Sequence, residues 1–126
     1  MAKTQLRWKK KPEAEDYTGA GNYLSLLCSE GKAKKLVRAL REAPTIKRAA
    51  KDLLRASRLP LLPRDEPHVS EDLDKIHGGV PLAPVLLVCG DMSSDIPLTV
   101  ADGYHRICAI YYYNSKLMVE CRMVRD

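Results

Sequence analysis

The segment Leu98-Thr99-Val100-Ala101-Asp102-Gly103-Tyr104-His105-Arg106 decides the fold, because it joins two kinds of structure within a few residues. Positions 98–101 are apolar or β-branched, which is typical of a short strand. Gly103 stands at the turn, and the apolar positions 107, 110 and 111 have the spacing of one helix face. The segment therefore predicts a strand that runs directly into a helix, as in a mixed α/β domain.

The turn at Gly103 is also the first candidate for a binding site. A glycine there lets the backbone approach a ligand closely, and the following helix points its free N–H groups at the same place. His105 and Arg106 add two more donors, although basic side chains are electrostatically unfavourable in a first helical turn. A bound anion, above all a phosphate group, explains them. The alternative is that both side chains bond to the protein's own carboxylates, with Asp102 as the first partner.

The other elements of residues 59–126 complete a small α/β core. Residues 84–89 are apolar on both faces, which is typical of a central strand that is covered on both sides. Residues 59–62 are flanked and broken by proline, so we expect an edge strand there. A helix is expected to begin at Ser70 and to end at Gly78, and positions 119–123 alternate as in a half-buried final strand.

Residues 17–58 are predicted to be a basic helical segment that packs on this core, preceded by a flexible basic N-terminus over residues 1–16. The apolar positions 33, 36, 37 and 40 have helical spacing, and positions 46, 49, 50, 53 and 54 repeat it after Pro44. A weaker helix is expected over residues 22–28. The fold class is therefore α/β (α+β), with an N-terminal helical extension.

The net charge of the chain also changes sign after residue 58. Residues 1–58 carry 15 basic and 6 acidic side chains, a net charge of +9, whereas residues 59–126 carry 6 and 10, a net charge of −4. On the predicted helix after Pro44, four cations follow one another at spacings of four, four and three residues: Lys47, Lys51, Arg55 and Arg58. Lys34, Arg38 and Arg41 do the same on its neighbour. These stripes predict contact with DNA or RNA, unless the cations lie in water or against the acidic half.

Composition excludes several classes of protein. With 126 residues, one domain is expected, and no apolar run approaches the roughly 18 residues of a membrane helix. No apolar segment follows the basic N-terminus, so a secretory signal is not expected and a cytoplasmic location is. The four cysteines contain no CxxC pair, which predicts reduced thiols and no metal site.

Two motifs and the order of elements resemble the ParB/sulfiredoxin fold over about residues 59–124. The motifs are Ala101-Asp102-Gly103-Tyr104-His105-Arg106 followed by Ala109, and Val80-Pro81-Leu82-Ala83-Pro84-Val85-Leu86-Leu87. The chain as a whole is similar to small bacterial proteins of this group. The resemblance implies a small mixed sheet of the ParB/sulfiredoxin type with a nucleotide cleft. It also implies that the phosphate site is lined by Gly103, Tyr104, His105 and Arg106.

The chain departs from two branches of that family. Sulfiredoxins have a cysteine where this chain has Tyr104, so repair of sulfinic acids lacks its nucleophile. Partition-type ParB proteins have Glu-Arg-Arg in the turn and a helix-turn-helix after the fold, so a chromosome-partition clamp is not expected. The remaining branches are free-serine kinases and ParB-like nucleases.

We therefore expect a ParB-like, phosphate-binding protein whose ligand is a nucleoside triphosphate or diphosphate, with or without Mg²⁺. A nucleotide hydrolase or a small-molecule kinase would use Asp102, His105 and Glu66 for catalysis. Further acids near the first strand, Asp65, Glu71 and Asp72, either serve this chemistry or cap the helix and offset its dipole. The alternative function is a nucleic-acid-binding module or ParB-like nuclease that works through the basic helices.

Overall fold

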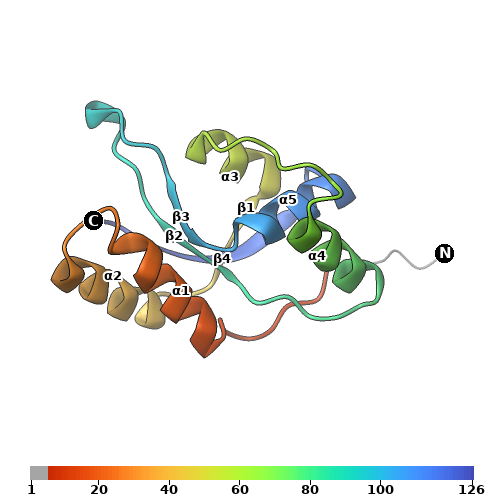
Figure 1. The fold of residues 1–126 in the computed structure, drawn as a ribbon, viewed down its shortest axis with the longest axis horizontal. Helices are drawn as coiled ribbons and strands as arrows, with labels where there is room; N and C mark the ends of the chain where they lie inside the picture. Colours follow the sequence, from red (N-terminus) through yellow and green to blue (C-terminus); the bar gives the residue numbers. More distant parts are fainter. Residues whose placement is uncertain (1–5) are drawn as a thin grey trace.

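The computed structural model describes residues 6–126, which form five α-helices, one short 3-10 helix and a four-stranded mixed sheet (Figure 1). In chain order the elements are α1 (Ala14–Leu24), α2 (Glu30–Glu42), β1 (Ile46–Ala49), α3 (Ala50–Ser57), α4 (Pro67–His77), β2 (Val85–Val88), η1 (Met92–Ser94), β3 (Thr99–Asp102), α5 (Tyr104–Tyr113) and β4 (Met118–Val124). The mixed α/β class is confirmed.

The sheet has the strand order β1-β4-β2-β3. β2 and β4 run parallel, with Val85 opposite Cys121 and Leu87 opposite Met123. The two outer strands, β1 and β3, run antiparallel to their neighbours. The parallel central pair explains why β2 lies in the interior of the molecule, since parallel strands are usually covered on both faces.

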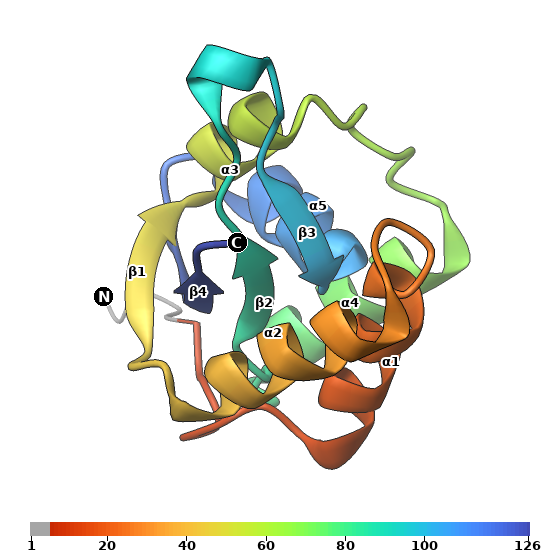
Figure 2. The ribbon, with the colours of Figure 1, turned by 90° about the vertical axis from the view of Figure 1, so that its left-hand side faces the viewer.

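Helices cover both faces of the sheet, so the molecule has three layers (Figures 1 and 2). Val85 and Leu87 of β2 belong to the core beneath α3, α4 and α5, whereas Leu86 and Val88 belong to the core beneath α1 and α2. All four side chains are buried. The predicted central strand is therefore confirmed.

The strand-to-helix turn is also confirmed. β3 ends at Asp102, and α5 begins at Tyr104 with Gly103 as its N-cap. Gly103 has φ of +110°, and a Cβ atom there would lie 2.4 Å from Cγ1 of Val85. No other residue type fits this turn, because the backbone conformation and the contact with β2 both exclude a side chain.

The helix predicted across positions 46–54 is wrong in its first half. Residues Ile46–Ala49 form β1, which pairs with β4, and α3 begins only at Ala50. Lys47 lies opposite Glu120 in this pairing. The weaker helix is also misplaced: α1 spans Ala14–Leu24 and buries Tyr17, Ala20 and Leu24.

Two elements near the middle of the chain differ from their prediction. Residues 59–62 form no strand; their carbonyl groups instead accept side-chain hydrogen bonds, that of Pro60 from the Tyr104 hydroxyl and that of Leu62 from the Tyr112 hydroxyl. α4 begins at Pro67 rather than Ser70, because proline is suited to a first helical turn and Glu66 caps the helix. The helix ends at Gly78 as predicted.

Residues 6–16 differ from the flexible segment that the composition predicts, while residues 1–5 of that segment lie outside the described range. The carbonyl of Arg7 accepts from the N–H of Leu82 at 2.8 Å, and the N–H of Lys9 donates to the carbonyl of Leu82 at 2.8 Å. These bonds tie the chain before α1 to the core. In residues 6–126 the four cysteines are free thiols, and none of the helices has the length and apolar content needed to cross a membrane.

Candidate functional site

A cleft of about 350 Å³ opens where β3 meets α5. Its walls come from the segment that begins α1, from α4, from the residues before β2 and from the turn at Gly103. The volume is within the range of small-molecule sites, at its lower end. The lining residues are Lys9, Glu13, Glu15, Asp16, His68, Glu71, Asp72, Lys75, Pro81, Leu82, Ala83, Asp102, Gly103, His105 and Arg106.

Arg106 is held by three acceptors of the protein itself. Its Nη2 lies 2.6 Å from Oδ2 of Asp102 and 3.2 Å from Oδ1 of Asp16, and its Nη1 donates to the carbonyl of Ala83 at 2.7 Å. Only 12% of the side chain is exposed. The contact with Asp102 is the one that the protein-carboxylate alternative expects. Arg106 thus ties α1, β3 and α5 together at the floor of the cleft.

Among the acids that line the cleft, Asp102 has the most strongly shifted pKa. Burial and a hydrogen bond with the Asp16 carboxyl raise its pKa to about 7, and the neighbouring Arg106 only partly opposes this rise. A carboxyl group that is buried beside another acid ionises less easily, so Asp102 keeps its proton up to about neutral pH. A group with a pKa near 7 in a cleft is suited to giving or accepting a proton.

Asp16 is a site residue that the sequence prediction missed. Its Oδ2 accepts from the N–H of Glu13 at 2.8 Å and completes a capping box at the start of α1, while its Oδ1 faces Arg106. Gly19 lies on the same helix, and a Cβ atom there would come within 2.9 Å of Oδ1 of Asp102. The Glu13-x-x-Asp16 spacing is a signal for the helix start. Nothing local indicates its partner, which is 90 residues away.

His105 lines the cleft. Glu66 does not line it, but it positions the His105 ring. Nε2 of His105 lies 3.2 Å from Oε2 of Glu66, and the other oxygen of Glu66 accepts the N–H of His68. The His68 and His105 rings are 4.9 Å apart between centroids. The three predicted catalytic residues are therefore near one another, with Asp102 and His105 in the cleft and Glu66 behind the imidazole.

Three of the four predicted phosphate-binding residues line the cleft, and the fourth does not. Gly103, His105 and Arg106 line the cleft, whereas the hydroxyl of Tyr104 is bonded to the carbonyl of Pro60 and the residue is not part of the lining. The acids divide too: Glu71 and Asp72 line the cleft and Asp65 does not. Burial raises the pKa of Asp72, against the opposing effect of Lys75.

The cleft carries more acidic than basic side chains. Six carboxylates line it, against two lysines, one arginine and two histidines. Several of these acids already face cations: Glu13 lies 2.7 Å from Lys9, and Glu71 and Asp72 lie 3.9 and 3.8 Å from Lys75. Within residues 6–126 no group of three or more histidine, cysteine or acidic side chains converges as metal ligands would.

The four cations predicted to contact nucleic acid do not lie on one helix face. Lys47 is on β1, Lys51 and Arg55 are on α3, and Arg58 follows the end of α3 with φ of +58°. Nζ of Lys51 lies 3.0 Å from Asp52, and Nη2 of Arg58 lies 2.6 Å from Asp95. A continuous helix would have aligned these four cations on one face. The strand at residues 46–49 separates Lys47 from the other three.

Comparisons of the chain with protein-family models, with curated proteins and with solved structures find no match.

Proposed function

We propose that the cleft binds a nucleotide by its phosphate groups at the N-terminus of α5, in a fold of the ParB/sulfiredoxin type. The proposal rests first on the turn at Gly103. Because the N-cap is a glycine, it has no side chain to accept the first N–H groups of α5, which remain available to a ligand. The close approach of Val85 excludes a Cβ atom at Gly103, so the N-cap of α5 stays without a side chain.

The side chains around the turn supply donors and a proton. His105 is 41% exposed, and Glu66 orients its ring, so the imidazole is accessible to a ligand in the cleft. Arg106 is a positioning residue, because it holds Asp16 and Asp102 beside the turn. Below about pH 7 the proton on Asp102 lowers the negative charge that a phosphate would meet.

The same geometry fits phosphoryl transfer to an oxygen nucleophile. Asp102 is the group that we assign to accept the proton of that nucleophile, which is water in a nucleotide hydrolase or a hydroxyl group in a small-molecule kinase. In the ionised form its carboxylate is a base of the right strength near neutral pH. His105 would stabilise charge on the transferred group.

Nucleic-acid binding by the cations of β1 and α3 is not favoured. Lys47 lies opposite Glu120 on the neighbouring strand, and both Lys51 and Arg58 are paired with aspartates. Cations that already face acids release few counterions when they meet a phosphate backbone.

Calorimetric titration with ATP, ADP, CTP and GTP, each with and without Mg²⁺, tests the proposal. We expect saturable binding of at least one nucleotide and a loss of tenfold or more in affinity in His105→Ala. His77→Ala is the matched control, because His77 is exposed on α4 and packs against Tyr113 outside the cleft. Wild-type protein that binds none of these nucleotides at millimolar concentration would refute the proposal.

A further inference from the structure

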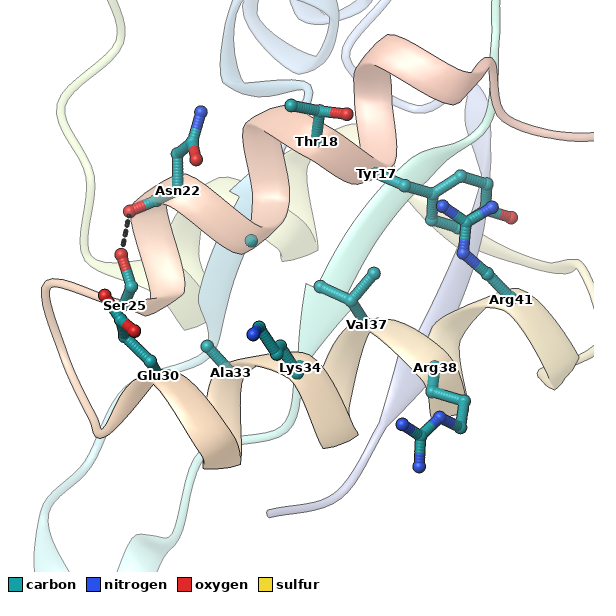
Figure 3. Close-up of a pocket in the computed structure, with 11 residues that line it drawn as sticks. Tyr17, Thr18, Asn22, Ser25, Glu30, Ala33, Lys34, Val37, Arg38 and Arg41 are labelled. Carbon is teal, nitrogen blue, oxygen red and sulfur yellow. Dashed lines mark hydrogen bonds between the residues drawn. The ribbon is translucent and has the colours of Figure 1, made fainter.

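A second concave surface lies between α1 and α2, and it shares no lining residue with the cleft at Gly103. Its volume is about 570 Å³. The two helices run antiparallel, with Tyr17 and Arg41 at one end of the groove and Ser25 and Glu30 at the other (Figure 3). Leu24, Leu36 and Leu40 of these helices are buried in the core with Leu86 and Val88 of β2, whereas Thr18, Asn22 and Lys34 of the groove are exposed.

Small side chains line the floor of the groove. Gly21 and Ala33 lie there with Val37, and Gly21 stands in the interior of α1. Glycine weakens a helix interior relative to alanine. Packing does not require it here, since a Cβ atom at Gly21 would meet only Cγ2 of Val37, at an ordinary 3.5 Å. The space above Gly21 is therefore open although a side chain would fit it.

The two walls differ in charge. α2 contributes three exposed cations at spacings of four and three residues, whereas α1 contributes neutral hydrogen-bonding side chains at the same spacings; the residues are Lys34, Arg38 and Arg41, and Thr18, Asn22 and Ser25. None of the three cations forms an ion pair with an acid in the described part of the chain. In Figure 3, the Arg38 side chain points away from α1, whereas the Arg41 guanidinium lies over the Tyr17 ring.

One end of the groove is fixed in place. The guanidinium of Arg41 lies over the Tyr17 ring, 4.2 Å from its centroid. Arg122 holds both residues from below, since its Nη1 lies 3.1 Å from the Tyr17 hydroxyl and 2.8 Å from the Arg41 carbonyl. Arg41 is thus presented at the end of the groove with little freedom to lose when an anion binds.

We propose that this groove binds an extended peptide segment with acidic side chains. Lys34 and Arg41 would face the carboxylates, the apolar floor would take a small side chain, and the neutral wall of α1 would hydrogen-bond the peptide backbone. From Lys34 to Arg41 the groove runs along seven residues of α2, about 10 Å, which matches about three residues of an extended chain.

A nucleic acid fits these features less well. A duplex places phosphates on both sides of a groove, whereas the cations here lie on one wall only. Single strands are usually held by bases stacked on exposed aromatic rings. The one ring in the groove, that of Tyr17, is 5% exposed and is covered by Arg41.

Fluorescence anisotropy with a labelled hexapeptide of alternating leucine and glutamate tests the proposal. We expect saturable binding that falls tenfold or more in Gly21→Leu, which fills the groove, and in Arg41→Glu. Gly31→Leu is the matched control, because Gly31 lies on α2 with no atom within 4 Å of an added Cβ, and its affinity should stay within twofold of wild type. Circular dichroism would show that each variant is folded.

Three outcomes would overturn the proposal: no saturable binding of the acidic peptide at millimolar concentration, equal binding by Gly21→Leu and wild type, or tighter binding of an alternating leucine–lysine peptide or of oligo-dT. His105→Ala and added nucleotide should leave peptide affinity unchanged. The result is therefore independent of the function proposed for the cleft.

Discussion

The Arg106 guanidinium lies 2.6 Å from the Asp102 carboxylate, and both side chains are largely withdrawn from solvent, with 12% and 24% exposed. The pair connects the end of β3 to the first turn of α5. A cation in a first helical turn is unfavourable beside the helix dipole, and Asp102 and Asp16 offset that cost. Arg106 therefore reaches the cleft as part of an ion triad rather than as a free anchor.

Arg106→Ala is expected to destabilise the fold by about 3 kcal/mol, because it leaves two carboxyl groups in a partly buried site without their cation. Urea denaturation at pH 7 measures this loss. The control is Lys116→Ala, at an exposed position. The triple variant Arg106→Ala, Asp16→Asn, Asp102→Asn should recover part of the stability. If Arg106→Ala is as stable as wild type, the triad does not stabilise the fold.

The raised pKa of Asp102 predicts a pH-dependent stability. The folded state holds the proton up to about pH 7, whereas the unfolded chain releases it near its ordinary value of 3.8. The folded state binds more protons between these values, so the free energy of unfolding should fall as pH rises from about 4 to 7. Asp102→Asn should flatten this dependence in urea titrations at several pH values. The same slope in wild type, Asp102→Asn and the exposed control Asp65→Asn would contradict the assignment.

The fold was predictable where a few neighbouring residues determine an element. The site was predictable where its residues are adjacent in sequence. The apolar run at Val85–Val88 and the turn at Gly103 both carry their meaning in a few neighbouring residues. β1 was missed because positions 46–54 also match a helical period, and only pairing with β4 selects the strand. Asp16 was missed for the same reason, since its role depends on Arg106 at the other end of the chain.

Nucleotide affinity should rise as pH falls from 8 to 6. Over this range Asp102 takes up its proton and the cleft becomes less negative, which favours a phosphate ligand. The gain should be about threefold or more, the effect of removing one charge at roughly 6 Å in a water-like medium. Calorimetry at the two pH values measures it. Asp102→Asn should bind with a smaller pH dependence than wild type, and an undiminished dependence would assign the effect to another group.

Tyr104→Phe should lower stability without changing nucleotide affinity. The hydroxyl donates to the carbonyl of Pro60, so its removal costs about 1 kcal/mol and loosens the connection between α3 and α4. Because the side chain does not line the cleft, the binding isotherm should match that of wild type. A clear loss of affinity in a stable variant would place Tyr104 in the site, as the family resemblance implies.

The same substitution at two glycines of α1 should have opposite effects on stability. Gly21→Ala should stabilise the protein by about 0.5 to 1 kcal/mol, because alanine is the better helix former and its Cβ atom meets only Val37, at 3.5 Å. Gly19→Ala gains the same helix propensity, but its Cβ atom would lie 2.9 Å from Oδ1 of Asp102. The carboxyl group cannot simply rotate away, since Arg106 and Asp16 hold it.

Gly19→Ala should therefore be less stable than Gly21→Ala in urea denaturation, and it should disturb Asp102 as well. If the carboxyl group moves away from Asp16, its pKa falls, and the pH dependence of stability between pH 4 and 7 becomes shallower than in wild type. Gly21→Ala should keep the wild-type pH dependence, because it lies outside the triad. Equal stability and equal pH profiles in the two variants would mean that α1 does not press on Asp102 in solution, and the coupling of α1 to the cleft would then be wrong.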